Sequence, residues 1–113
     1  MTGRKHTLMK YVSLAAGDMT QTLTSASTDI RFLDDIVIYF NFTGTPTGTF
    51  GVQVSPDNSA WYDLTLVPTP TASGSAGNAR ISMYQLPDHY IRAKYTPSSG
   101  SGSLTVTIAG KMI

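Results

Sequence analysis

Apolar residues recur at every second position along the stretch from Asp35 to Leu66. Its first part places them at Ile36, Ile38, Phe40 and Phe42. A period of two is the period of a β-strand and not of a helix. A second alternating run covers residues 50–55 and a third β-rich run covers 60–66, with the turn segments GTPTG and SPDNS between the runs. Gly, Pro, Asp and Asn favour tight turns, so the stretch predicts three consecutive antiparallel strands, a β-meander.

The C-terminal half continues the alternating pattern. Strands are predicted over residues 80–86, 90–95 and 103–109, whose expected inward positions are Ile81, Met83, Ile91, Ala93, Tyr95, Leu104, Val106 and Ile108, with Gln85 a further candidate. Residues 67–79 contain prolines and small side chains and predict a mobile loop. The terminal GKMI can extend the last strand.

The N-terminal third carries a weaker pattern. Met1 to Lys10 is polar and basic and offers no core face, and Tyr11 to Leu14 predicts a short strand. The Thr- and Ser-rich stretch 20–28 fits an edge strand, a loop across a face or an arm. Asp29 to Asp34 predicts a short strand or a corner.

These elements amount to about seven to eight strands separated by Gly and Pro turns, which predicts an all-β fold, an antiparallel β-sandwich of jelly-roll or immunoglobulin-like type. The composition agrees, because Thr, Ser, Gly, Val, Ile and Tyr are plentiful and all seven acidic residues are Asp. A length of 113 residues fits one domain. We expect a flexible N-terminal arm with a first short strand over residues 1–19 and the sandwich domain over residues 20–113.

Charge and cysteine content narrow the possible partners. The net charge of +1 provides no strong field for nucleic acid or an anionic membrane, and no apolar run approaches the roughly 20 residues of a membrane helix. The chain has no Cys, so disulfides and thiolate metal sites are ruled out. Basic residues near the N-terminus are not followed by the apolar region of a secretion signal.

Catalytic and metal-binding patterns are weak. The histidines are His6 and His89, and the adjacent Asp88 does not make a catalytic pair with His89, since neighbouring side chains of an extended chain point apart. The chain has no HExxH, GxGxxG or P-loop motif. Asp29, Asp34 and Asp35 would bind calcium only if their loops converged, and adjacent aspartates are more often solvated. We therefore expect no enzyme activity, no cofactor and no metal.

The aromatic residues offer another kind of site. Trp61 and Tyr62 are neighbours in a predicted strand and so face opposite ways. One interpretation places Trp61 in the sandwich core. The other makes Trp61, Tyr62 or Tyr39 a platform on which sugar rings stack or a partner protein binds.

The segments GTFGVQVSPDNSAWYDL and HYIRAKYTPSSGSGSLTVTIAGKMI resemble small virion proteins of tailed bacteriophages, over roughly residues 40–113. The hairpin pattern formed by Ser55, Asp57 and Trp61 also occurs in discoidin-like carbohydrate- and lipid-binding sandwiches, where it is a structural turn. The resemblance implies a β-sandwich present in many copies on a capsid or a tail.

The favoured hypothesis is a non-enzymatic capsid decoration, or cement, protein on the virion surface that is assembled in the host cytoplasm. It would be a homo-oligomer, a dimer or trimer, and would bind the major capsid protein or other virion proteins through candidate contacts Arg4, Lys5, Lys10 and Tyr62. No nucleic acid or membrane partner is expected. The alternatives are a carbohydrate-binding module and a tail or head–tail connector component, and the sequence does not separate the connector from the decoration protein.

Overall fold

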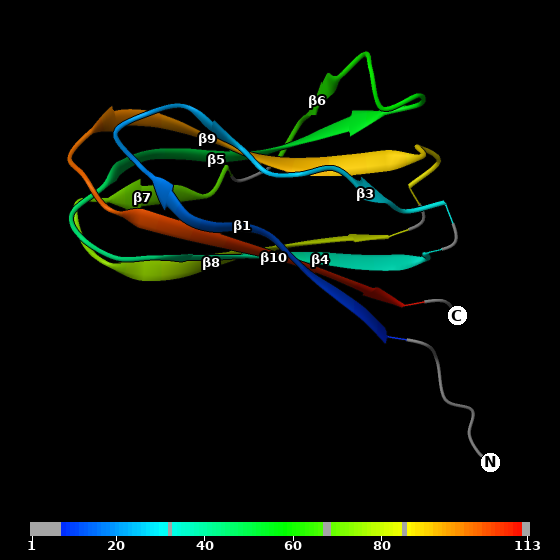
Figure 1. Ribbon diagram of the computed structural model, residues 1–113, viewed down its shortest axis with the longest axis horizontal. Helices are drawn as coiled ribbons and strands as arrows, with labels where there is room; N and C mark the ends of the chain where they lie inside the picture. The colour runs from blue at the N-terminus through cyan, green and yellow to red at the C-terminus, as the bar shows by residue number, and fades with distance from the viewer. Residues whose placement is uncertain (1–7, 32, 67–68, 85, 112–113) are drawn as a thin grey trace.

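The computed structural model describes residues 8–31, 33–66, 69–84 and 86–111, with side chains from residue 14 onward. These residues form ten β-strands (Figure 1). No helix in the described part of the chain has the length and apolarity needed to cross a membrane. The strands are β1 (Leu8–Asp18), β2 (Leu23–Thr24), β3 (Thr28–Asp29), β4 (Asp35–Phe42), β5 (Thr47–Ser55), β6 (Tyr62–Leu64), β7 (Thr71–Ser73), β8 (Gly77–Tyr84), β9 (Tyr90–Ser99) and β10 (Ser103–Lys111).

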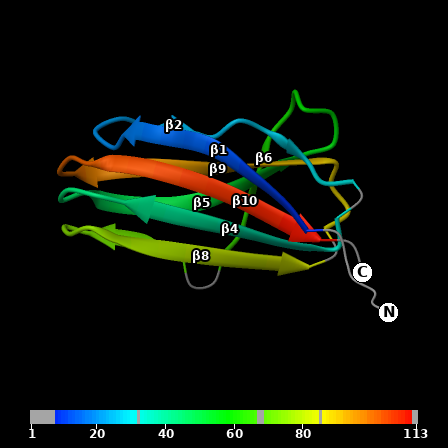
Figure 2. The same ribbon diagram turned by 60° about the horizontal axis from the view of Figure 1, so that its bottom comes forward.

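The strands form two antiparallel sheets that pack face to face (Figures 1 and 2). Sheet A has four strands in the order β1-β10-β4-β8. Sheet B has six strands with the path β2-β9-β5-β6, in which β3 also pairs with β9 and β7 also pairs with β5. The predicted all-β antiparallel sandwich is confirmed.

The strand order identifies the sandwich as a jelly roll. Both β2 and β3 pair with β9, and both β6 and β7 pair with β5. The β2–β3 segment and the β6–β7 segment can therefore each be treated as one interrupted strand. Except for β5 and the β6–β7 segment, which are neighbours in sheet B, consecutive segments of the chain then alternate between the two sheets. Two Greek keys result, which is the jelly-roll arrangement. Of the two predicted sandwich types, the structure therefore has the jelly roll.

The predicted β-meander over residues 35–66 is wrong. Strand β4 lies in sheet A and β5 lies in sheet B, and only β5 and β6 pair as neighbours along the chain. The linker between β4 and β5 bonds to the β9–β10 connection instead of closing a hairpin: the Thr43 amide donates to the Ser103 carbonyl at 3.0 Å, and the Thr45 amide donates to the Ser101 carbonyl at 2.8 Å. The chain is thereby carried across the end of the sandwich into the other sheet.

Two glycines permit this close approach of two loops. Gly100 has a φ of 78°, and a Cβ atom there would collide with the carbonyl of Thr45. A Cβ atom at Gly102 would collide with the carbonyl of Thr43. Only glycine combines a left-handed backbone with such close backbone contact at low cost.

Two further elements differ from the prediction, and a third takes one of its predicted forms. Strand β1 is longer than residues 11–14, since it begins at Leu8 and ends at Asp18. Register shifts between Val12 and Leu14 and between Leu14 and Gly17 break the alternation in its second half. The expected loop 67–79 contains β7 and the start of β8, and its small residues carried no strand signal. The stretch 20–28 takes the edge-strand form, as β2 and the start of β3 along β9.

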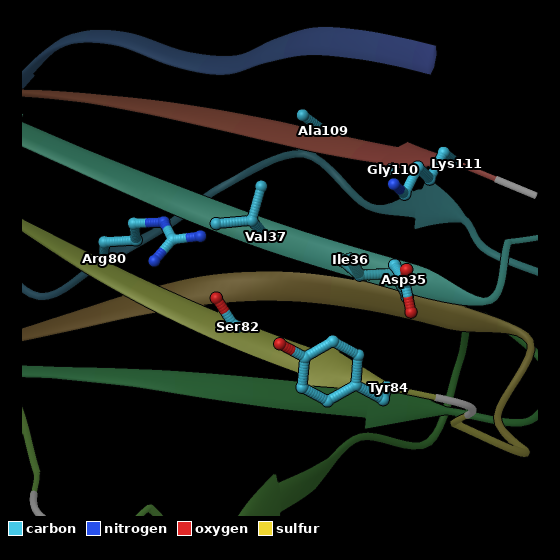
Figure 3. A pocket seen from close by; sticks show the side chains of 9 residues that line it. All are labelled: Asp35, Ile36, Val37, Arg80, Ser82, Tyr84, Ala109, Gly110 and Lys111. Atoms are coloured by element: carbon cyan, nitrogen blue, oxygen red, sulfur yellow. The ribbon is translucent and has the colours of Figure 1, made fainter. Parts of the chain in front are cut away.

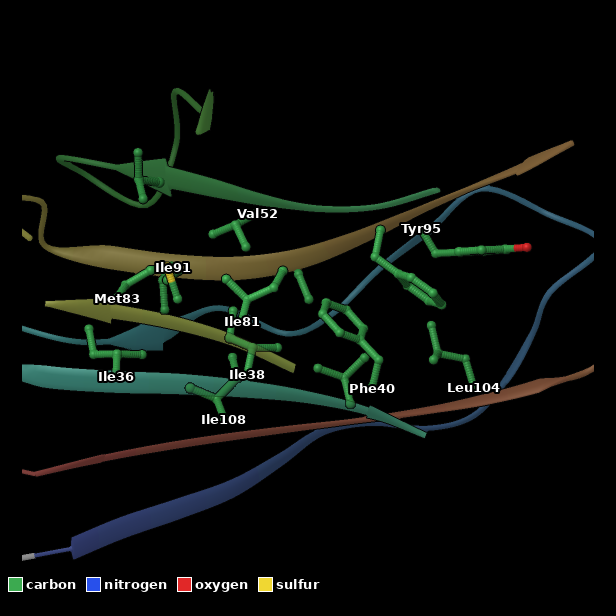
Figure 4. Close-up of a cluster of buried hydrophobic side chains, with 14 of the residues drawn as sticks. Ile36, Ile38, Phe40, Val52, Ile81, Met83, Ile91, Tyr95, Leu104 and Ile108 are labelled. Atoms are coloured by element: carbon green, nitrogen blue, oxygen red, sulfur yellow. The ribbon is translucent and has the colours of Figure 1, made fainter. Parts of the chain in front are cut away.

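The core lies between the two sheets and is built from the inward positions of both (Figure 4). Phe50 from sheet B packs against two rings of sheet A, with ring centroids 4.6 Å from Phe40 and 5.3 Å from Phe42. It also contacts Tyr95 on the neighbouring strand at 5.0 Å. Such tilted aromatic contacts stabilise a core beyond the area that they bury. The predicted inward residues of β8, β9 and β10 are buried as expected, except Gln85, which lies outside the described residues.

We predict that Phe50→Ala strongly destabilises the protein. The side chain is 1% exposed, and replacing a buried Phe by Ala leaves a cavity that costs about 3–5 kcal/mol of unfolding free energy. Urea unfolding followed by tyrosine and tryptophan fluorescence measures the change. Tyr62→Ala is the matched control, because Tyr62 is 59% exposed. Equal midpoints for the two variants would contradict the assigned core.

We predict that Tyr95→Phe is at least as stable as the wild type. The Tyr95 hydroxyl is buried and has no hydrogen-bond partner among the described residues, and an unsatisfied buried hydroxyl costs about 1–3 kcal/mol. Burial raises the pKa of Tyr95 above its ordinary value of 10.0. The folded state therefore holds this proton more tightly, and the associated stability is complete below pH 10.0 and falls as the pH rises further. Urea unfolding at rising pH should show that the unfolding free energy falls more steeply in the wild type than in Tyr95→Phe. Equal slopes in the two proteins would contradict the raised pKa of Tyr95.

Candidate functional site

The outer face of sheet A carries a shallow depression of about 280 Å³ across β10, β4 and β8 (Figure 3). The strand registers place Ala109, Val37 and Ser82 in one row and Lys111, Asp35 and Tyr84 in the next. We call the outward residues of these strands the sheet A face; its members used below are Asp35, Val37, Tyr39, Asn41, Arg80, Ser82, Tyr84, Thr105, Ala109 and Lys111.

The sheet A face has an apolar floor and an aromatic and cationic rim. Val37 is half-buried and Ala109 is buried. The exposed large hydrophobic side chains among the described residues are Tyr39, Tyr62 and Tyr84, at 38%, 59% and 69% exposure. Tyr39 and Tyr84 lie on this face, and Arg80 pairs directly opposite Tyr39. An open surface of this kind can adhere to another protein but does not enclose a small molecule.

The outer face of sheet B is different, because its polar side chains bond to one another. Arg92 Nε donates to Gln53 Oε1 at 2.8 Å, and Gln53 Nε2 donates to Asp63 Oδ1 at 3.0 Å. The Arg92 guanidinium also lies 4.2 Å from the centroid of the Trp61 ring, a cation–π contact. These four residues fasten the β5–β6 hairpin to β9.

Trp61 does not fill the sandwich core. Its side chain is half-buried and lies outside the cluster of buried hydrophobic residues. The interpretation that places Trp61 in the sandwich core is therefore wrong. Trp61 directly precedes β6 at the edge of sheet B, and its ring contacts Arg92 on the outer face of that sheet. One face of the ring is also occupied by that guanidinium, which leaves less of it for stacking on a ligand.

Ser55 and Asp57 build the turn of the β5–β6 hairpin. The fully buried Ser55 Oγ accepts the amides of Asp57 and Asn58 at 3.2 and 2.9 Å and donates to Asp57 Oδ1 at 3.1 Å. Asp57 Oδ1 accepts the amides of Ser59 and Ala60, both at 3.0 Å. These backbone bonds, with a smaller contribution from Ser55, lower the pKa of Asp57. Asn58 adopts a φ of 62°, which Asn tolerates in a turn.

Within residues 8–31, 33–66, 69–84 and 86–111, no group of three or more His, Cys, Asp or Glu side chains could hold a metal ion. The Asp29 carboxylate forms an ion pair with Arg31 at 2.7 Å. The backbone of His89 joins two segments, since its amide donates to the Ser55 carbonyl and its carbonyl accepts the Ile30 amide.

The partner contacts named from the sequence are not brought together. Arg4 and Lys5 lie outside the described residues. Lys10 lies in β1, at one edge of sheet A, where its backbone pairs with Ala109 of β10. Tyr62 lies in β6, at the far edge of sheet B. Sequence reasoning did not single out Arg80 and Lys111 as partner contacts, because alternation shows that a residue points outward but not which strands share its face.

No protein-family model matches the chain, and no curated protein matches its sequence. Among solved structures, the chain is similar to the SPBc2 prophage-derived protein YomS, with a TM-score of 0.62 and 7% identity over 97% of this chain and 99% of that one. At this identity the likeness shows a common fold.

Two other solved structures are more loosely similar. One is from Bacillus endospore appendages, described as disulfide-linked pili, with a TM-score of 0.46 and 11% identity over 100% of this chain and 96% of that one. The other is the CBM1 structure of BiXyn10A, also with a TM-score of 0.46 and 11% identity, over 89% of this chain and 61% of that one.

We predict that Asp57 makes the hairpin a source of acid sensitivity. The lowered pKa of Asp57 means that its stabilising effect is complete above the ordinary value of 3.8 and is lost as the pH falls through the folded-state pKa. Urea unfolding at neutral pH and near pH 3 should show that the wild type loses more unfolding free energy on acidification than Asp57→Asn does. The Asn side chain keeps the acceptor oxygen but carries no charge. Parallel losses in the two proteins would argue against this role.

Proposed function

We propose that this chain is a non-enzymatic structural protein of a phage particle that binds the assembled head shell as a decoration protein. The observation that carries the proposal is the sheet A face, a broad shallow surface with exposed tyrosines and a cationic rim. The full-length fold likeness to a prophage-derived protein supports the phage origin. The resemblance of residues 40–113 to small virion proteins points the same way.

The chemistry of the sheet A face suits contact with another protein. Tyrosines provide large contact areas with few rotatable bonds, and they are enriched at interfaces. Between the rows of Tyr39 and Tyr84 lie the uncharged side chains of Ser82, Val37 and Ala109, so little charge must be desolvated at the centre of the contact. Arg80 and Lys111 outnumber the single Asp35 among the charged members of this face, which favours an acidic partner surface. The major capsid protein is the partner that we propose, and the virion surface is the proposed location.

Carbohydrate binding is supported less well by the geometry. The aromatic residues suggested as its platform were Trp61, Tyr62 and Tyr39. Tyr39 lies on sheet A, whereas Trp61 and Tyr62 lie at the β5–β6 hairpin of sheet B, so the three do not form one platform. A tail or connector role would use the same kind of adhesive face and differs in the surface that is bound.

We predict that purified protein binds undecorated phage heads in a saturable, stoichiometric manner, as measured by co-sedimentation. The double variant Arg80→Ala/Tyr84→Ala should bind at least about 10-fold more weakly, since truncated interface tyrosines and arginines commonly cost more than 1 kcal/mol each. Both side chains are exposed, so the fold should survive.

Tyr62→Ala is the control for this experiment and should bind like the wild type, because Tyr62 lies away from the sheet A face. Absence of head binding across a range of salt concentrations would refute the decoration role, and binding to isolated tails instead would assign the protein to the tail. A selective loss in Tyr62→Ala would move the contact to sheet B.

A further inference from the structure

The two edges of sheet A are built differently. Strand β1 carries two register shifts, and Ala16 within it has a φ of 52°. Such bulges twist an edge strand and hinder its pairing with another chain. Strand β8 forms an unbroken register with β4 from Asp35–Tyr84 to Phe42–Gly77, without a bulge. In the described part of the chain no strand pairs with its other side, so its outer backbone groups remain available.

The free side of β8 borders a groove of about 490 Å³. Four consecutive β8 residues, from Arg80 to Met83, form one wall, and Leu64, Leu66 and Pro70 are among the residues of the other. Ile81 and Met83 are each only 7% exposed and belong to the core. The groove therefore offers a backbone edge beside apolar side chains, which are the two features that an added strand requires.

We propose that β8 pairs antiparallel with β8 of a second copy of this chain, about a two-fold axis at Ser82. In this register Ser82 lies opposite Ser82 of the second copy, Arg80 lies opposite Tyr84, and Ile81 lies opposite Met83. The Arg80–Tyr84 pairs place a guanidinium beside an aromatic ring on the outer face. The Ile81–Met83 pairs join apolar side chains on the inner face, next to the groove.

The two neighbouring two-fold registers, with axes at Arg80 and at Ile81, are poorer. An axis at Arg80 places two arginines directly opposite each other, which is unfavourable. An axis at Ile81 pairs Arg80 with Ser82 and leaves Tyr84 opposite Asn78. A shift by one residue would set inward residues opposite outward ones and mismatch the two faces. Of the registers compared, the axis at Ser82 thus gives the best self-complementarity in charge and apolarity.

This pairing would join two copies of sheet A into one continuous sheet whose outer faces lie on the same side. The pairing does not rest on the proposed head binding, because it can be tested on the isolated protein. If both the β8 pairing and the head binding are correct, the dimer presents two linked copies of the sheet A face to the head, and linked contacts raise overall avidity.

The first test measures the mass of the full chain by light scattering after size exclusion. The wild type should be a dimer, and Ser82→Lys a monomer, because two like charges would meet at the axis. An equimolar mixture of Ser82→Lys and Ser82→Asp should recover the dimer. Thr96→Lys, an exposed strand hydroxyl of sheet B, is the control and should remain dimeric. A monomeric or trimeric wild type, or a dimeric Ser82→Lys, overturns the proposal.

A second test reads the register directly and uses the absence of native cysteine. Ser82→Cys should form a disulfide-linked dimer under mild oxidation, because directly opposite Cα atoms in antiparallel strands lie about 4.5–5.5 Å apart. Arg80→Cys alone should not crosslink, since its two copies would be four residues, or roughly 13 Å, apart along the strand. A mixture of Arg80→Cys and Tyr84→Cys should crosslink. Efficient crosslinking of Arg80→Cys alone would refute this register.

Discussion

The contact of aromatic rings across the two sheets is the interaction on which the rest of the structure depends. Phe50 of sheet B meets Phe40 and Phe42 of sheet A and also Tyr95 beside it. A sheet with one apolar face is stable only when a second layer covers that face. These rings provide much of the buried area through which each sheet covers the other, and the aliphatic side chains of β8, β9 and β10 extend the same layer.

That constraint explains why the loops at one end are so closely packed. A chain that fills both layers must cross between them, and the β4–β5 linker does so while its amides bond to the β9–β10 connection. Gly100 and Gly102 allow the two backbones to meet. The β5–β6 hairpin is stabilised differently, because the Ser55 and Asp57 side chains accept hydrogen bonds from four backbone amides of its sharp turn.

With the inner faces used for stability, function is left to the outer faces and the edges. On sheet B, Arg92, Gln53 and Asp63 bond to one another and Arg92 covers Trp61, so these groups already have partners. On sheet A, Tyr39 and Tyr84 stand exposed around a shallow apolar floor. The regular β8 edge adjoins the same face. This asymmetry between the two layers is the reason that we propose an adhesive role for sheet A.

The sequence by itself determined which side chains are buried along the longer strands. The inward positions of β4, β9 and β10 follow from a period of two, because alternate side chains of a strand face opposite sides whatever their neighbours are. The same local rule could not show that β4 and β5 belong to different sheets, since alternation fixes the face of a strand and not its partner. Nor could it find β7, whose small residues become a strand only through pairing with β5. Only the tertiary structure decided these points, and with them that Arg80 and Tyr84 share a face with Tyr39 and that Trp61 lies beneath Arg92, because strand partners are chosen by contacts between residues far apart in the chain.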